Sequence, residues 1–199
     1  MSDLSDHWNA RYDGAIAETL TWYEPVPEAG LRLVDQAGLP RGSAVVDVGA
    51  GASSMPDALA ARGFDVTVMD LSEAALAGAR VRLPQARFVV GDVLAWEPDR
   101  AYALWHDRAV FHFLTEAEQR DAYRAILAKA VPVGGAVVIA TFAEDGPEKC
   151  SGLPVRRYSY DALVAEFADI CAPEDGVRHE HITPKGTVQP FIYALLRRV

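Results

Sequence analysis

The sequence predicts an α/β fold: a Rossmann-like, doubly wound and mostly parallel sheet with helices on both faces. Short apolar segments alternate with helical patterns along the chain, which is the order of β-α-β units. The first apolar segment runs into a glycine turn, and several of the others end in an aspartate. The chain has 199 residues, of which 50% are hydrophobic, so we expect a single domain over residues 1–199 with a full core.

Seven apolar segments are predicted to form the strands of this sheet. The segment at 136–141 is apolar on both faces, as a buried parallel strand requires. The last two segments flank Pro184, Lys185 and Gly186, so we expect them to form a C-terminal antiparallel hairpin. The predicted strands cover residues 44–48, 65–69, 87–90, 102–106, 136–141, 181–183 and 189–196.

Capping residues and helix breakers define the predicted helices. Ser72 and Ser159 stand where N-caps are favoured, and Thr115 with Glu118 is predicted to form a capping box. Two tryptophans and two tyrosines lie within residues 4–23, ahead of the first strand, so residues 1–40 are expected to form a helical lid or cap segment. The predicted helices lie within 4–23 and over 28–37, 55–62, 73–81, 116–130 and 160–168.

The turn after the first strand indicates a nucleotide-like ligand. Gly49 and Gly51 lie between an apolar strand and a helix start, which lets backbone approach a ligand closely. A dinucleotide site presents bare N–H groups to a pyrophosphate, and the carboxylate of Asp47 would repel that anion. A carboxylate here suits a ligand with a cationic group, such as the ammonium and sulfonium of S-adenosylmethionine (SAM).

Aspartates follow three further apolar segments. Asp70 lies about 20 residues past the glycine turn, where an acid is placed to bond ribose hydroxyls. Asp92 and Asp107 end the third and fourth segments. Because ligands of open α/β sheets bind at the carboxyl edge, we expect these side chains to gather around one site.

These motifs resemble those of the class I SAM-dependent methyltransferases, over roughly residues 40–145. The resemblance implies a seven-stranded sheet, SAM as cofactor and S-adenosylhomocysteine as product. It assigns Asp47, Gly49 and Gly51 to the methionine-binding loop, Asp70 to the ribose, and Asp92 with Val93 to the adenine. The family's loop often has a third glycine where this chain has Ser53, whose hydroxyl either bonds the ligand or caps the next helix. The remaining expected cofactor contacts are Trp22, Leu71, Gly91 and Asp107.

Residues 105–114 are expected to form the acceptor side. The segment resembles those of thiopurine S-methyltransferase-like proteins and of some methyltransferase-like lysine methyltransferases, and it lacks the Asn/Asp-Pro-Pro-Tyr motif that places amino groups of nucleobases or glutamine. Asp107, Arg108 and His112 are the candidate catalytic residues. His112, or alternatively His106, is a candidate general base, with Asp107 as a base or an orienting partner. Arg108 is expected either to grip an anionic acceptor or to hold Asp107.

The favoured function is methyl transfer from SAM to a small soluble acceptor, with a thiol or another soft nucleophile slightly preferred. One alternative is a protein-lysine methyltransferase, and another is a non-catalytic SAM-binding or regulatory protein. A nucleotide-binding oxidoreductase is disfavoured by Asp47 and by Ser54, which stands where that fingerprint has Gly or Ala. The sequence leaves the acceptor atom and the oligomeric state open.

Composition limits the remaining possibilities. A net charge of −9 opposes binding to a phosphate backbone, so nucleic acid is not an expected partner. No apolar run approaches the length of a membrane span, and the polar N-terminus is unlike a secretory signal. Two cysteines form no disulfide framework, so a cytoplasmic location is expected. His179 and His181 lack a third ligand, so no metal is expected. Cys150 follows Lys149, whose ammonium would lower its pKa.

Overall fold

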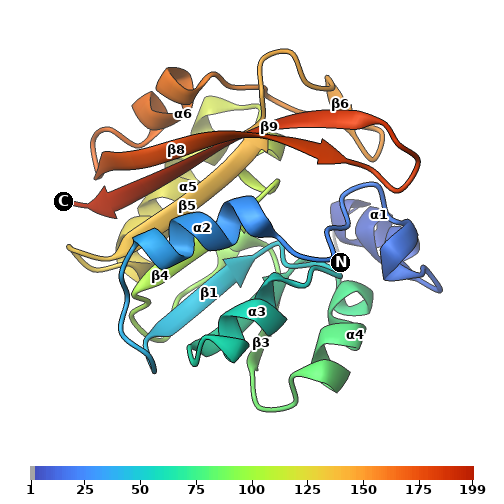
Figure 1. Cartoon of the computed structure of the whole chain (residues 1–199), viewed down its shortest axis with the longest axis horizontal. Coiled ribbons are helices and arrows are strands. Elements are labelled where there is room, and N and C mark those ends of the chain that lie inside the picture. The colour runs from blue at the N-terminus through green and yellow to red at the C-terminus, as the bar shows by residue number, and fades with distance from the viewer. Residues whose placement is uncertain (1–2) are drawn as a thin grey trace.

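A seven-stranded sheet organises residues 3–199, which the computed structural model describes (Figure 1). Its strand order is β3-β2-β1-β4-β5-β9-β8. The first five strands in sequence pair in parallel, whereas β9 lies between β5 and β8 and runs antiparallel to both. The strands are β1 (Ala44–Val48), β2 (Asp65–Asp70), β3 (Arg87–Val90), β4 (Leu104–Arg108), β5 (Ala136–Phe142), β8 (Cys171–Ile182) and β9 (Val188–Arg198).

Helices pack on both faces of the sheet, as the predicted fold class requires. One buried cluster joins the sheet to α2 (Glu28–Gln36), α3 (Met55–Ala61) and α4 (Glu73–Arg82). The other joins it to α5 (Ala117–Ala130) and α6 (Tyr160–Glu166). The mixed seven-stranded sheet therefore confirms the predicted fold class.

Side chains of β4 alternate between these two clusters, because successive residues of a strand point to opposite faces. Leu104 belongs to the cluster under α2, and Trp105 belongs to the cluster under α5. His106 and Arg108 consequently share the face of Leu104, while Asp107 shares the face of Trp105. This alternation decides which β4 side chains reach the candidate site.

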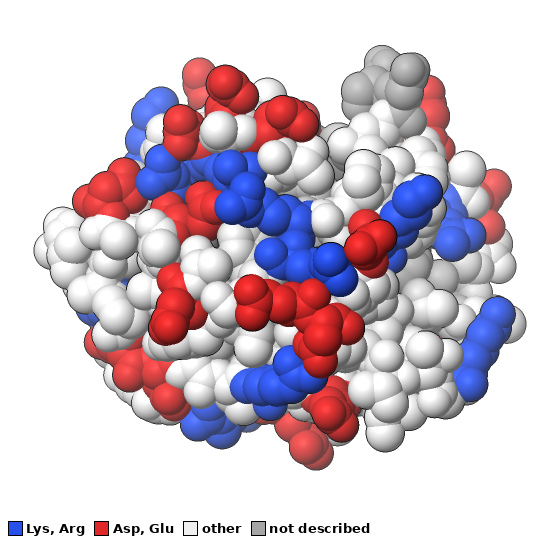
Figure 2. All heavy atoms as spheres, turned by 90° about the horizontal axis from the view of Figure 1, so that it is seen from above, with Lys and Arg blue, Asp and Glu red and all other residues white. Residues whose placement is uncertain are grey.

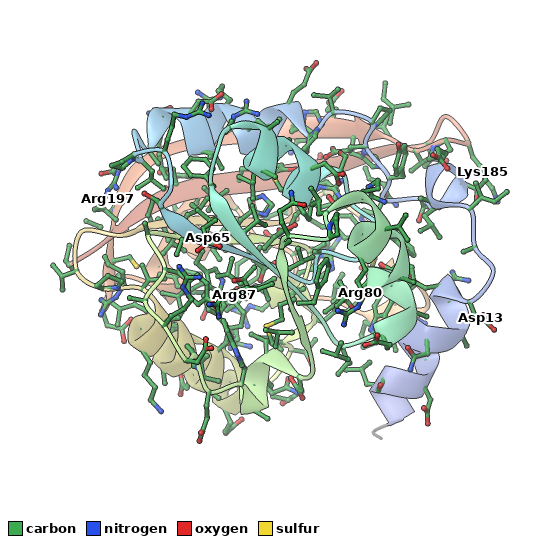
Figure 3. All side chains as sticks on the ribbon, turned by 90° about the horizontal axis from the view of Figure 1, so that it is seen from below. Asp13, Asp65, Arg80, Arg87, Lys185 and Arg197 are labelled. Carbon is green, nitrogen blue, oxygen red and sulfur yellow. The ribbon has the colours of Figure 1, made fainter. Side chains whose placement is uncertain are left out.

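The N-terminal segment lies at the carboxyl edge of the parallel strands. It contains α1 (Asp3–Tyr12), within the range predicted to hold an N-terminal helix, and a short 3-10 turn, η1 (Ala17–Thr19). Asn9 joins α1 to the start of α4, because its Oδ1 accepts a hydrogen bond from Oγ of Ser72 at 2.7 Å. Figure 3 shows Asp13, just after α1, and Lys185, in the β8–β9 loop, toward the same end of the molecule.

Two predicted strands differ most from the structure in where they begin. The strand predicted at 102–106 begins at residue 104, because the N–H of Tyr102 bonds instead to the carbonyl of Ala130 at 2.8 Å. The strand predicted at 181–183 is the last part of β8, which begins at residue 171. The turn-forming residues of this stretch stay extended because they pair with β9 across an irregularity at Pro173 and Asp175.

The predicted capping box of α5 is wrong by one residue. The N-cap is Glu116, whose side chain is paired reciprocally with Gln119, instead of Thr115 with Glu118. Two short 3-10 turns, η2 (Val93–Ala95) and η3 (Phe111–Phe113), follow β3 and β4, and a two-residue ladder joins β6 (Lys149–Cys150) to β7 (Leu153–Pro154). No helix within residues 3–199 is long and apolar enough to cross a membrane.

Candidate functional site

Two cavities adjoin one another at the carboxyl edge of the parallel strands. Both are lined by Trp22, Gly49 and Arg108. The larger cavity is lined by strand ends and by the N-terminal segment. The residues at the strand ends are Asp70, Leu71, Gly91, Asp92 and Val93. Those of the N-terminal segment are Leu4, Trp8, Tyr12 and Trp22. Asp47, Ser53 and His106 line the smaller one.

The glycine turn between β1 and α3 has no room for side chains. Gly49 and Gly51 have φ values of +66° and +52°, in the left-handed region that favours glycine. A Cβ at Gly49 would lie 1.9 Å from Cγ2 of Val110, and one at Gly51 would lie 2.3 Å from the hydroxyl of Tyr12. The turn therefore depends on glycine both for its backbone and for its close packing.

Asp70 joins this turn to the end of β2. Its carboxylate accepts hydrogen bonds from the N–H of Gly51 and the N–H of Ser72, both at 2.8 Å. Burial raises the pKa of Asp70 to about 6, although these two backbone donors oppose the shift. A carboxylate has about four lone-pair sites, so two hydroxyl donors of a ligand can be added to these bonds.

Asp92 follows β3 and lines the larger cavity. Its Oδ1 accepts from the N–H of Leu94 at 2.9 Å, which starts η2 and fixes the direction of the chain after β3. Gly91 and Val93 flank it in the lining. Asp92 and Val93, the two residues predicted to meet an adenine, therefore line the same cavity as the expected cofactor contact Gly91.

Asp47 and His106 are neighbours across β1 and β4 and form a buried pair. Oδ1 of Asp47 lies 2.6 Å from Nδ1 of His106. Within residues 3–199, Oδ2 of Asp47 and Nε2 of His106 have no hydrogen-bond partner. Burying a carboxylate oxygen without a hydrogen-bond donor costs free energy of folding. Asp47 lines the smaller cavity, where a bound ligand would supply that donor.

Ser53, the departure from the glycine pattern, lies one residue before the N-cap of α3, which is Ser54. The Oγ of Ser53 accepts from the N–H of Met55 at 3.0 Å. Ser54 donates its hydroxyl proton to the carbonyl of Glu24 at 2.8 Å and so ties the start of α3 to the N-terminal segment. Ser53 also lines the smaller cavity, so capping and ligand contact are compatible roles.

Arg108 holds the N-terminal segment over the cavities. Its Nε donates to the hydroxyl of Tyr193 at 3.0 Å, and its Nη1 donates to the carbonyl of Trp22 at 2.9 Å. Nη2 lies 3.3 Å from Oε1 of Glu24, and the guanidinium carbon lies 4.6 Å from the ring centre of Phe191. Arg108 makes no contact of this kind with Asp107, so the hypothesis that it holds Asp107 is wrong.

Glu24 is a partly buried contact point that no motif in the sequence indicates. Nε2 of His179 and Nδ1 of His181 each lie 3.3 Å from its Oε1, beside Arg108. Burial raises the pKa of Glu24, but the hydrogen bond from His181 and the charge of Arg108 outweigh it, so the net pKa is lowered. Nε2 of His181 also lies 2.7 Å from the carbonyl of Thr21. The two histidines thus contact the N-terminal segment.

Comparison with known proteins supports the ligand class that this geometry indicates. A family model described as a methyltransferase domain matches residues 45–134, which include the glycine turn and all three strand-end acids that line the larger and smaller cavities. The trans-aconitate 2-methyltransferase of Variovorax paradoxus (strain S110) is 40% identical over 90 residues, which cover 44% of this chain and 35% of that protein. The match supports the predicted resemblance to the class I SAM-dependent methyltransferases. It spans about a third of the length of the curated relatives it matches.

Solved methyltransferase structures share the fold over almost the whole chain. The 1,6-didemethyltoxoflavin-N1-methyltransferase of Burkholderia thailandensis, with bound 1,6-didemethyltoxoflavin and S-adenosylhomocysteine, has a TM-score of 0.75 at 21% identity and covers 98% of this chain and 85% of that one. The N-methyltransferase NodS of Bradyrhizobium japonicum WM9, in complex with S-adenosylhomocysteine, has a TM-score of 0.74 at 14% identity, with 97% and 99% covered. These structures confirm the predicted fold.

Asp107 has a different place in this methyltransferase fold from the one expected. It is fully buried on the face of α5, and neither of the two cavities is lined by it. It accepts hydrogen bonds from the N–H groups of Val110 and Phe111, at 2.8 and 3.0 Å, and from the hydroxyl of Tyr123. Burial raises its pKa to about 6. Asp107 therefore fixes the turn after β4, and its predicted contact with acceptor or cofactor stays a prediction.

His112 is likewise outside the two cavities, contrary to its predicted role as general base. Its ring is fully buried, with its centre 4.5 Å from the ring centre of Phe113 and 4.9 Å from that of Phe142. Burial lowers its pKa to about 3, so the imidazole is neutral at neutral pH. Both ring nitrogens lack a hydrogen-bond partner within the described residues. The side chain therefore packs in the core.

Cys150 lies at the end of β6 and lines the larger cavity. Burial raises the pKa of its thiol to about 11, although the charge of Arg108 opposes the shift. The expectation that Lys149 lowers this pKa is therefore wrong, because desolvation outweighs the nearby cations. The thiol is protonated at neutral pH and contributes apolar surface to the cavity wall.

Proposed function

We propose that the protein transfers the methyl group of SAM to a small-molecule acceptor. The unpartnered Oδ2 of Asp47 beside the smaller cavity carries this proposal, because a cationic ammonium is the group that this buried oxygen lacks. Asp70 would hold the ribose hydroxyls, and Asp92 with Val93 would meet the adenine in the adjoining cavity. Bound SAM supplies an electrophilic sulfonium methyl for in-line displacement, and the protein's task is to align the acceptor and exclude water.

The wall formed by the N-terminal segment favours a small acceptor over a protein lysine. Trp8 lies at the centre of an aromatic group, with its ring centre 6.2 Å from Tyr12, 6.1 Å from Trp22 and 5.5 Å from Phe113. These rings all line the larger cavity and enclose it with rigid apolar surface. Such an enclosure suits a small molecule, whereas a protein substrate requires a shallow, open cleft.

The acceptor is proposed to react in the protonation state in which it binds. Tyr12 and Cys150 are the titratable side chains on the aromatic side of the larger cavity, and burial raises the pKa of both far above neutrality. Neither is an anion at pH 7, so neither is suited to take a proton from the acceptor. A thiol of low pKa, or another soft nucleophile, meets this condition.

A carboxylate is the second candidate acceptor. Several curated relatives are named trans-aconitate 2-methyltransferases, and a carboxylate needs no base because it is already ionised at neutral pH. Arg108, which lines both cavities, is the cation available to such an anion. Its Nη2 lies 3.3 Å from Oε1 of Glu24 and has no hydrogen bond within the described residues, so an anionic acceptor would compete with Glu24 for this donor.

Nucleic acid is not proposed as a substrate or partner. On the face shown in Figure 2, basic side chains form a band closely bordered by acidic ones. Surface arginines are commonly paired with carboxylates, as Arg178 is with Asp145 at 2.9 Å. A phosphate backbone requires unneutralised positive charge, so this arrangement supports the expectation drawn from the net charge of −9. The cytoplasmic location and the single-domain organisation stay predictions.

Calorimetry followed by a labelling assay tests the proposal. SAM and S-adenosylhomocysteine should bind and NAD should not, since Asp47 opposes a pyrophosphate. Methyl-labelled SAM is then incubated with thiols, carboxylates, amines, phenols and cell lysate, and products are separated into small-molecule and protein fractions. Label in the protein fraction alone would favour the lysine alternative. Binding without turnover on any acceptor would favour the non-catalytic alternative.

A matched pair of glycine variants controls for the site. Gly49→Ala places a Cβ 1.9 Å from Val110 and should abolish binding, whereas Gly134→Ala, at φ +86° with no atom within 4 Å of the new Cβ, should retain it. Both substitutions place alanine at a positive φ, so a difference in SAM affinity between the two variants reports on the glycine turn between β1 and α3. Binding of NAD in preference to SAM would contradict the proposed function.

A further inference from the structure

We propose that His106 is a positioning residue that aims the carboxylate of Asp47 at the amino-acid end of the cofactor, an inference that rests on the proposed function. Asp47 and His106 occupy paired register positions of the adjacent parallel strands β1 and β4. Their side chains therefore leave the sheet on the same face, side by side. The distance of 2.6 Å between Oδ1 and Nδ1 is that of a strong, charge-assisted hydrogen bond.

The hydrogen bond has a defined direction. An ionised carboxylate only accepts hydrogen bonds, so Nδ1 of His106 must be the donor. This occupies Oδ1 and leaves Oδ2 as the oxygen without a partner. His106 thereby selects which oxygen of Asp47 is available to a ligand in the smaller cavity, which both residues line.

The imidazole of His106 is itself held in place by packing. Gly30, inside helix α2, lies directly over it: a Cβ at Gly30 would lie 3.1 Å from Nε2 of His106 and 2.6 Å from Cε of Met55. Glycine inside a helix costs about 0.5–1 kcal/mol relative to alanine, so its presence at this buried position has a packing reason. The space that Gly30 leaves is filled by the ring of His106 and by Met55.

A purely structural pair would satisfy its polar atoms internally. Here the two side chains are 1% and 3% exposed, yet each retains one polar atom with no partner within residues 3–199. For Asp47 that atom is a carboxylate oxygen, which is the strongest acceptor available to a ligand ammonium. The geometry therefore points to a ligand contact made by Asp47 and set by His106.

Two ligands separate this role from a structural one. S-adenosylhomocysteine carries the amino-acid end, whereas 5′-methylthioadenosine shares the nucleoside thioether and lacks it. In calorimetry, His106→Phe should weaken S-adenosylhomocysteine about tenfold or more, because a charge-assisted contact is misdirected. The affinity for 5′-methylthioadenosine should stay unchanged. His106→Asn retains an N–H donor near the position of Nδ1 and should restore part of the lost affinity.

His112→Phe is the matched control, because His112 is an equally buried histidine that lies outside both cavities. It should change neither affinity. If His106→Phe weakens both ligands equally, or weakens neither, the positioning role is overturned while the proposed function stands. If the wild-type protein binds neither ligand, both proposals are overturned. If His106→Phe fails to fold, the affinities for the same two ligands are compared in His106→Asn and in Gly30→Ala, whose new Cβ crowds the ring of His106.

Discussion

Nη2 of Arg108 lies 3.3 Å from Oε1 of Glu24, and this contact joins β4 to the chain that precedes α2. Together with the hydrogen bond from Nη1 to the carbonyl of Trp22, it holds an aromatic wall of the larger cavity in place. Arg108 therefore acts on the N-terminal segment whether or not it also meets an acceptor.

Arg108→Lys should loosen residues 20–26, because lysine has no planar fork and cannot reach three partners at once. Hydrogen exchange of these residues should be faster in the variant, and S-adenosylhomocysteine should protect the wild-type segment more than the variant. Losing one hydrogen bond to a charged group costs about 1.5–3 kcal/mol, so affinity should fall about tenfold. Equal protection with and without ligand in the wild type would show that the segment is a fixed part of the core.

Asp70 gives ligand binding a pH dependence. Its pKa is about 6, and its ionised form is the acceptor that ribose hydroxyls need. The affinity for S-adenosylhomocysteine should therefore fall as the pH drops below about 6, measured by calorimetry between pH 5 and 8. Asp70→Asn should bind about tenfold more weakly at pH 7 and lose this dependence. Because Asp70 also holds the N–H of Gly51, the variant's fold must be checked by circular dichroism.

Asp107 should make the ligand-free protein more stable on mild acidification. Its folded pKa of about 6 lies above the unfolded value of about 3.9, so between these values the folded state binds more protons. Unfolding free energy therefore falls as the pH rises through this window and levels off above it, by up to about 1.4 kcal/mol per pH unit. Urea unfolding at pH 5, 6 and 7 tests this, and Asp107→Asn should show a smaller slope. An unchanged slope would contradict the raised pKa.

His112→Ala separates packing from catalysis. Removing a fully buried ring that contacts Phe113 and Phe142 should lower the unfolding free energy by about 2–4 kcal/mol. The kcat per folded molecule should stay unchanged, whereas loss of a general base would lower it about 10²–10⁴-fold. Activity assays below the unfolding temperature, corrected for the folded fraction, decide between these outcomes.

Cys150 should react slowly with iodoacetamide. A thiol pKa of about 11 leaves about one molecule in 10⁴ as thiolate at pH 7, and only the thiolate is nucleophilic. Because Cys150 lines the larger cavity, S-adenosylhomocysteine should slow the reaction further. Mass spectrometry of the modified peptide follows both effects. Rapid modification at pH 7 would indicate a lowered pKa, as the neighbouring Lys149 first suggested.

The donor side of the site could be predicted from the sequence because its residues are local to strand ends. Asp47, Asp70 and Asp92 each follow or end an apolar segment, and the parallel order of the strands brings them to one edge. The acceptor side could not be predicted in the same way. With the fourth strand placed two residues too early, Asp107 was expected beyond its end, whereas inside the strand its side chain points to α5.

Contacts between distant segments leave no pattern in the sequence. Thr21 and His181 are 160 residues apart, and Glu24 has no periodic or motif context that would relate it to Arg108. The pair of Asp47 and His106 did carry a signal, because aligning the first and fourth strands in parallel places the two residues opposite one another. Recognising it required the correct register, which depends on where β4 begins.

The walls of the larger cavity have two origins in the chain. Strand ends between residues 48 and 93 form the nucleoside side, while α1, the segment around Trp22 and the turn after β4 form the other. The N-terminal segment is fastened by polar contacts through Ser5, Asn9, Thr21, Trp22 and Glu24. A chimera that exchanges residues 4–20 for those of a related protein, with Ser5 and Asn9 retained, should therefore acquire a new acceptor range while its affinity for S-adenosylhomocysteine is preserved.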